Sequence, residues 1–164
     1  MKYELIELQG LRVIGVAKEI PMKEGHVECP KFWGEFVARF IATMQPGQPL
    51  TPQQDAIQKN MIGEFGLCIC DDAKGTFQYV IGGRYLGGEV PEGFDLYDLP
   101  DGRWLKVHFE GGMPEFHKQY TEFYSKFLPE HPEFKARLDY NAEWYSEMDM
   151  NDPGYRCGLM VPLE

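Results

Sequence analysis

Two stretches of large apolar side chains recur at helical spacing, and they constrain the fold more than any other feature of the sequence. Residues three or four positions apart share one face of an α-helix, so each stretch predicts an amphipathic helix packed on a core. The first stripe comprises Trp33, Phe36, Val37, Phe40, Ile41 and Met44. The second comprises Phe116, Tyr120, Phe123, Tyr124, Phe127 and Leu128. Pro30 and Pro114 are expected to open the two helices, because proline's missing N–H is no loss in a first turn.

The segments around these helices predict β-strands. They are rich in β-branched and aromatic residues and are bounded by Gly, Pro and Asp. The predicted strands are residues 3–9, 12–20, 64–71, 77–85, 103–110, 138–147 and 155–163. Residues 51–60 are expected to form a short additional helix, and the Gly-, Pro- and Asp-rich segment 87–102 a connector.

The order strand, helix, strand, strand occurs once before the connector and again after it. The helix openings match at an offset of 84 residues, with Pro30 aligned to Pro114 and Phe36 to Tyr120. These observations predict an α+β fold of two duplicated βαββ units, at about 1–86 and 103–164, with one extra strand in front. A chain of 164 residues is expected to form one domain, with a pseudo-symmetric antiparallel sheet and its helices on one face.

The charge balance limits the partners of the chain. Its formal net charge is −10, from 26 acidic and 16 basic residues. An acidic surface repels phosphate backbones, so direct nucleic-acid binding is not expected. The same charge favours solubility or the attraction of cations.

Neither the cysteines nor the N-terminus indicates export. Charged residues occur too early in MKYELIELQG for a signal peptide, and no apolar run reaches the length of a membrane span. The four cysteines contain no CxxC pair, so we expect free thiols and a reduced, cytoplasmic location. His26 and Cys29 lack the further ligands that structural zinc needs, so no metal is expected. The glycines of residues 82–88 fit no phosphate-binding motif, and no cofactor is expected.

Alternation along two predicted strands separates their faces. In one strand Leu105, Val107 and Phe109 alternate with Trp104, Lys106 and His108. In the other, Tyr140, Ala142 and Trp144 alternate with Asn141, Glu143, Tyr145 and Glu147. We expect the helices to cover the apolar faces, which leaves Trp104, Glu143, Tyr145 and also Tyr79 on a free aromatic face. Two such units side by side would fold that face into a cleft for a flat or cationic ligand.

A simpler interpretation of these residues is also open. Antiparallel sheets often have one wet face, on which Glu143 and Tyr145 would need no function. Trp104 could lie at an interface. His108, which shares the Trp104 face, could be a solvated strand histidine rather than a cleft residue.

Four segments together resemble the GyrI-like small-molecule-binding domain, also called the bacterial effector-binding domain. They are RVIGVAKEI near the N-terminus, FQYVIGG, LPDGRWLKVHFEGGMPEF before the second helix, and AEWY near the C-terminus. The resemblance covers essentially the whole chain and rests on the order and spacing of the segments. Trp104 stands where the family usually has tyrosine, which keeps a ring but removes a hydroxyl.

The resemblance implies a central cleft in which a glutamate meets cationic or polar aromatic ligands. The residues expected to bind the ligand are Glu143, Tyr145, Trp104, Tyr79, His108, Tyr85, Trp33 and Phe36. The first hypothesis is therefore a stand-alone module that binds planar, often cationic, small molecules.

The resemblance also implies two other functions. Some stand-alone members of the family are hydrolases that open the cyclopropane of DNA-alkylating antibiotics. In that case Glu143 and Tyr145 would be the catalytic residues. Other members inhibit DNA gyrase, and such a role predicts a protein partner. Members fused to helix-turn-helix domains are sensors. We expect no such segment in these 164 residues, and the alternatives for a protein partner are a weak homodimer or a partner regulator.

Overall fold

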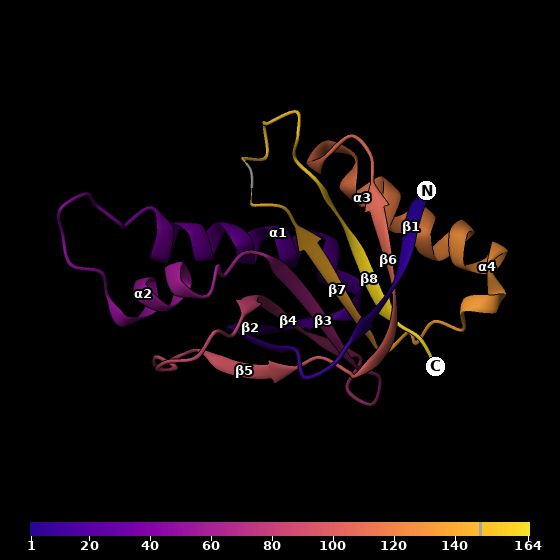
Figure 1. The fold of residues 1–164 in the computed structure, drawn as a ribbon, viewed down its shortest axis with the longest axis horizontal. Helices are drawn as coiled ribbons and strands as arrows, with labels where there is room; N and C mark the ends of the chain where they lie inside the picture. Colours follow the sequence, from indigo (N-terminus) through magenta and orange to yellow (C-terminus); the bar gives the residue numbers. More distant parts are fainter. Residues whose placement is uncertain (148) are drawn as a thin grey trace. The chain divides into compact units, whose positions relative to one another are not determined.

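The computed structural model describes residues 1–147 and 149–164, and these form two compact units (Figure 1). One unit is continuous and runs from Arg12 to Asp98. The other is split along the chain and combines Met1–Leu11 with Leu99–Glu164. We call them the continuous unit and the split unit.

The continuous unit carries four antiparallel strands in the order β3-β4-β2-β5. Its elements are β2 (Arg12–Pro21), α1 (Gly25–Phe36), α2 (Pro52–Lys59), β3 (Phe65–Asp71), β4 (Thr76–Arg84) and β5 (Asp95–Asp98). A 3-10 turn at Met22–Glu24 precedes α1, and a π-helical turn at Val37–Ile41 follows it. The short helix α2 begins with a capping box in which the Thr51 hydroxyl accepts from the Gln54 N–H.

The split unit carries four antiparallel strands in the order β1-β6-β8-β7. Its elements are β1 (Lys2–Leu8), β6 (Gly102–Phe109), α3 (Met113–Glu122), α4 (Leu128–Glu130), β7 (Tyr140–Tyr145) and β8 (Cys157–Pro162). A π-helical turn at Phe123–Phe127 joins α3 to α4, and a 3-10 turn follows at Pro132–Phe134.

The two units repeat one strand order, which confirms the predicted duplication and the α+β class. In each unit the strand before the long helix is flanked by an added edge strand, β5 beside β2 and β1 beside β6. On the other side of β2 lie β4 and then β3, and on the other side of β6 lie β8 and then β7. Both long helices also pass into a π-helical turn. The duplication therefore extends to details that residue patterns do not reveal.

Three features differ from the expectations. The extra N-terminal strand, β1, pairs with β6 and so belongs to the split unit. A short strand, β5, lies in the segment predicted to be a connector. Its four residues, DLYD, are too few to show the alternation that predicts a strand. Pro30 does not open α1, which begins five residues earlier at Gly25 and continues through the proline. Pro114 is the second residue of α3, so the two prolines are not equivalent.

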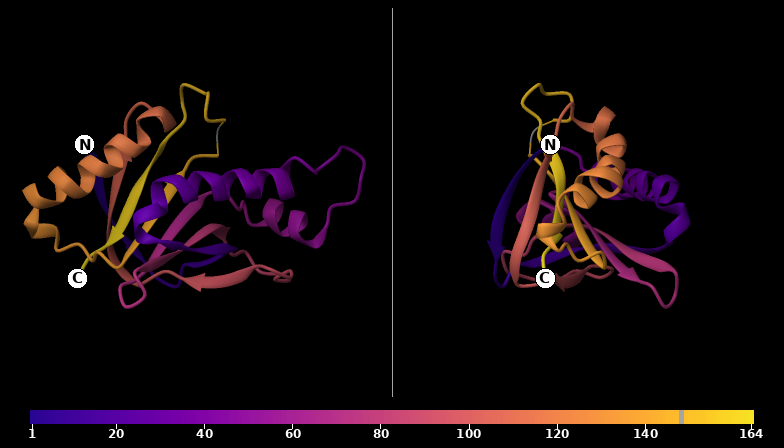
Figure 2. Two further views of the ribbon diagram at one scale, coloured as in Figure 1. Left: turned by 180° about the vertical axis from the view of Figure 1, so that it is seen from behind. Right: turned by 90° about the vertical axis from the view of Figure 1, so that its right-hand side faces the viewer.

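Each unit buries its helical stripe against one face of its own strands. In the continuous unit the core joins Phe36 and Phe40 to strand residues; these include Ile14, Ile20, Cys68, Phe77, Tyr79 and Ile81. In the split unit it joins Phe116, Phe123 and Phe127 to Leu105, Val107, Phe109, Cys157, Leu159 and Val161. Figure 2 shows α3 along one face of the split unit's strands. This face of each unit is hereafter its helix side.

Candidate functional site

Strand β7 directs Glu143 and Tyr145 to the helix side of the split unit. Glu143 pairs with Leu159 and Tyr145 with Cys157, and both partners belong to the core beneath α3. The Tyr145 ring stacks on Phe116 of α3, with centroids 5.7 Å apart and an angle of 25° between the planes. Both Glu143 and Tyr145 are half-buried. Thus a carboxylate and an aromatic ring stand two residues apart on one strand, against a helix.

Asn141 extends this row by one residue. It is 6% exposed, and its side-chain amide donates to the hydroxyls of Tyr120, at 3.3 Å, and Tyr124, at 3.1 Å. These tyrosines come from α3 and the π-helical turn that follows it. Alternation places Asn141, Glu143 and Tyr145 on the same face of β7. We call these three residues together with Tyr120 and Tyr124 the β7–α3 patch.

The charge of Glu143 acts within the core of the split unit. Burial, and to a lesser extent the nearby Glu143 carboxylate, raise the pKa of Cys157 to about 11. Burial likewise raises the pKa of Tyr155 to about 12, with a contribution from Cys157. Both residues therefore stay protonated and neutral at pH 7. The acidic side chain near Cys157 is therefore Glu143, which lies half-buried beside the core of the split unit.

Trp104 and His108 lie on the opposite face of these strands, so the expectation that they share a face with Glu143 is wrong. Trp104 pairs with Pro162 and His108 with Gly158, and Gly158 also pairs with Trp144. The side chains of Trp104, Lys106, His108 and Trp144 therefore share the face away from α3. Helix α3 covers the face of β7 that carries Asn141, Glu143 and Tyr145, which the sequence predicts to be the free face. Both faces of β7 carry aromatic rings, so either face is suitable for burial.

Trp104 fills space in this second face rather than lining an open surface. Its side chain has no exposed area, its indole N–H donates to the Pro100 carbonyl at 2.9 Å, and its ring meets Tyr140 edge-on. His108 is less enclosed and contacts Trp144, with ring centroids 5.0 Å apart, and Glu4 at 3.3 Å.

The remaining predicted residues lie in the continuous unit, where they belong to or pack against its core. Tyr79 is 1% exposed, and its hydroxyl accepts a hydrogen bond of 2.7 Å from the Trp33 indole. Phe36 is buried between Trp33 and Phe40. Tyr85 packs against the same core, and its hydroxyl donates to the Gly88 carbonyl. That these residues bind a ligand stays a prediction.

The helix side of the continuous unit offers a different chemistry at the place that Glu143 holds in the split unit. There the row across β2, β4 and β3 is Lys18, Tyr79 and Cys68. The corresponding row across β6, β8 and β7 is Val107, Leu159 and Glu143. Lys18 is paired with Glu28 of α1 at 3.3 Å. The two units therefore differ at this row: the split unit has the Glu143 carboxylate on β7, and the continuous unit has the Cys68 thiol on β3.

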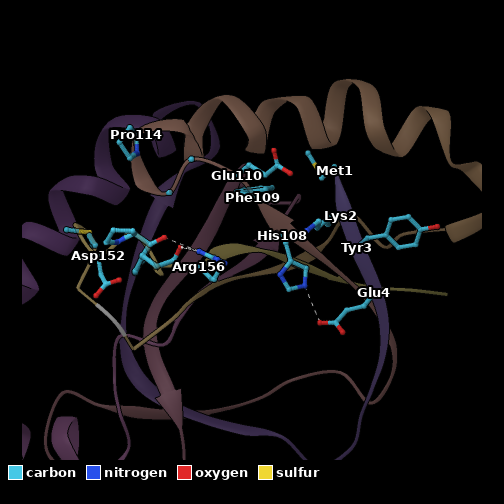
Figure 3. Close-up of a pocket in the computed structure, with 15 residues that line it drawn as sticks. Met1, Lys2, Tyr3, Glu4, His108, Phe109, Glu110, Pro114, Asp152 and Arg156 are labelled. Atoms are coloured by element: carbon cyan, nitrogen blue, oxygen red, sulfur yellow. Dashed lines mark hydrogen bonds and ion pairs between the residues drawn. The ribbon is translucent and has the colours of Figure 1, made fainter.

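A groove of about 940 Å³ opens on the split unit, and its lining residues differ from those of the β7–α3 patch (Figure 3). Its lining mixes basic and acidic side chains; these include Lys2, Glu4, His108, Glu110, Asp152 and Arg156. His108 and Glu4 point toward one another in it. The groove includes neither Glu143 nor Tyr145, and its mixed charges favour no single class of ligand.

The described part of the chain contains no group of three or more His, Cys, Asp or Glu side chains that could hold a metal ion. None of its helices is long and apolar enough to cross a membrane.

Sequence patterns alone do not identify Asn141, Tyr120 or Tyr124 as site residues. Alternation puts Asn141 on the same face of its strand as Glu143, but helical spacing puts the two tyrosines in the core stripe of their helix. The sequence feature that indicates this group is the Asn141 amide, two residues before Glu143. It becomes informative only when the face of β7 that carries both residues is known to contact α3.

Comparisons with known proteins agree with this architecture. The family model of the GyrI-like small molecule binding domain matches residues 1–164. A structure of SAV2435 bound to tetraphenylphosphonium is 16% identical, with a TM-score of 0.78, and the match covers 100% of this chain and 94% of that one. A putative bacterial transcription regulation protein from Staphylococcus aureus MU50 is 19% identical, with a TM-score of 0.75 and coverage of 100% and 99%.

A more distant structural match is the EcmrR C-terminal domain. It is 13% identical, with a TM-score of 0.53 and coverage of 99% and 97%. No curated protein sequence matches the chain. The family match spans every residue, and the chain accordingly belongs to the GyrI-like small-molecule-binding domains.

Proposed function

We propose that this domain binds planar aromatic cations at the β7–α3 patch. The observation that carries the proposal is the joint position of Glu143 and Tyr145 on the helix side of β7, with Tyr145 stacked on Phe116. A carboxylate offsets the charge of a cation, and a row of aromatic rings offers faces on which a flat molecule stacks. Half-burial strengthens both contacts, because part of the surrounding water is excluded.

Two further observations support the cationic character of the ligand. The net charge of −10 raises the local concentration of cations around the molecule. A relative of the same fold, SAV2435, was solved with tetraphenylphosphonium, which is an aromatic cation. Roles as a hydrolase or a gyrase inhibitor stay predictions of the family resemblance.

The test measures binding of 10-methylacridinium, a flat fluorescent cation, by titration. Glu143→Gln keeps the shape of the side chain and removes its charge, so the dissociation constant is expected to rise at least about tenfold, the scale of one charged contact. Glu147→Gln is the matched control, since Glu147 is exposed just beyond the end of β7. Equal affinities of Glu143→Gln and the unaltered protein would remove the basis of the proposal.

A further inference from the structure

The described residues include three buried polar side chains, Gln54, Asn60 and Asn141, and two of them use both ends of the amide. Gln54 accepts from the Thr51 N–H and donates to the Phe40 carbonyl and the Thr43 hydroxyl. Asn60 donates to the Ala56 carbonyl at 3.0 Å and accepts from the Leu86 N–H at 2.8 Å. These two amides are structural, because each ties neighbouring segments together and leaves no group unpaired.

Asn141 differs from both. Its amide nitrogen meets the hydroxyls of Tyr120 and Tyr124, but its oxygen Oδ1 is buried with no hydrogen-bond partner among the described residues. A buried amide oxygen without a donor is unfavourable, because it has lost the hydrogen bonds of water. A leucine would fill nearly the same volume without that penalty. The unpaired oxygen therefore points to a donor that arrives from outside the chain.

The position of this oxygen relates it to the proposed ligand. Asn141 and Glu143 lie two residues apart on one face of β7, a separation of about 7 Å along a strand. A flat molecule of two or three fused rings spans that distance. Such a ligand can place its positive charge near Glu143 and a polar hydrogen near Asn141.

We propose that Asn141 Oδ1 accepts a hydrogen bond from an N–H group of the ligand, and that the site thereby selects protonated aromatic amines over fully substituted cations. This inference rests on the proposed function and names its ligand class more narrowly. The two tyrosine hydroxyls hold the amide nitrogen, so the carbonyl oxygen is the end left to bind. An acceptor beside a carboxylate complements a group that is both a cation and a donor.

A matched pair of ligands tests the selection. 9-Aminoacridine and 10-methylacridinium are both flat cations at neutral pH, and only the first carries N–H groups. The unaltered protein is expected to prefer 9-aminoacridine about tenfold, the factor that 1.4 kcal/mol represents. In Asn141→Leu this ratio is expected to fall to about one, because the substitution weakens binding of 9-aminoacridine more than binding of 10-methylacridinium.

A second measurement needs no substitution. The carbonyl carbon of the Asn141 side chain is expected to shift downfield in the NMR spectrum when 9-aminoacridine binds, because its oxygen then accepts a hydrogen bond. Binding of 10-methylacridinium should leave this signal in place. This measurement decides the question even where Asn141→Leu fails to fold.

The outcomes separate the two proposals. Failure of both ligands to bind, or their indifference to Glu143→Gln, overturns the proposed function and this inference together. Binding of both through Glu143 with equal affinity, or a preference that survives in Asn141→Leu, overturns the inference alone. A lost preference together with the carbonyl shift supports it.

Discussion

The charge of Glu143 reaches a thiol on the neighbouring strand β8. Burial and then the Glu143 carboxylate raise the pKa of Cys157 from its ordinary 9.0 to about 11. Below pH 9 the thiol is protonated in both the folded and the unfolded chain. Between pH 9 and 11 only the unfolded chain loses this proton, which stabilises the unfolded state.

We therefore predict that the free energy of unfolding falls as the pH rises from 9 to 11. Urea unfolding at pH 8 and at pH 10.5 measures the loss. Cys157→Ala lacks the titrating thiol and is expected to lose less stability over the same interval, although it starts lower because a buried side chain has been truncated. An identical loss in both proteins would show that Cys157 does not titrate in this way.

At the scale of elements, β7 is held in place by Trp144, which lies across a glycine of β8. The Trp144 indole donates to the Val107 carbonyl at 3.1 Å, over Gly158. A Cβ atom at Gly158 would lie 2.0 Å from the Val107 carbonyl oxygen and 2.7 Å from the Trp144 indole nitrogen. The strand that carries Asn141 and Glu143 thus depends on the absence of a side chain on its neighbour.

Gly158→Ala is accordingly predicted to destabilise the protein by about 1–3 kcal/mol or more, the cost of forcing atoms into a packed site. It should also weaken binding of 10-methylacridinium, since β7 must move. Gly34→Ala is the matched control, because nothing lies within 4 Å of its added Cβ in α1. That change is expected to be neutral or to stabilise by up to about 1 kcal/mol. Similar unfolding midpoints for the two variants would contradict this account of β7.

The elements themselves were largely predictable, whereas the faces of the site were not. Alternation correctly separated Glu143 and Tyr145 from Trp144, because a strand leaves no other choice. It could not tell which face α3 covers, since rings on both sides of β7 make either face suitable for burial. Trp104 and Glu143 were therefore grouped wrongly. Their separation follows from the register of β6, β8 and β7, which depends on long-range pairing rather than local pattern.

On the scale of the whole molecule, the excess of acidic residues attracts cations over longer distances than contacts with Glu143 alone. Raising the salt from about 0.01 M to about 1 M shortens the reach of charge from about 30 Å to about 3 Å. The net charge of −10 is spread along the sequence rather than concentrated in one run. Much of its effect on a cation therefore acts over distances that salt screens.

Affinity for 10-methylacridinium is hence predicted to fall by about fivefold or more over this range of salt. Acridine at a pH where it is neutral serves as the control ligand, and its affinity should change little or rise slightly. In Glu143→Gln the salt dependence should persist in weaker form, because the remaining acidic residues still attract the cation. Equal salt dependence for the charged and the neutral ligand would show that the net charge plays no part.

The pairing of β1 with β6 has a consequence for how the chain acquires its structure during synthesis. Strand β1 leaves the ribosome before β6, yet Lys2 of β1 pairs with His108 of β6. At about 5–20 residues per second, the strand KYELIEL waits about 5–20 s for β6 to emerge. The continuous unit, which ends at Asp98, is complete before that moment. During synthesis β1 therefore lacks its partner strand after all residues of the continuous unit have been made. Its charged side chains, Lys2, Glu4 and Glu7, disfavour pairing with the wrong edge in that interval.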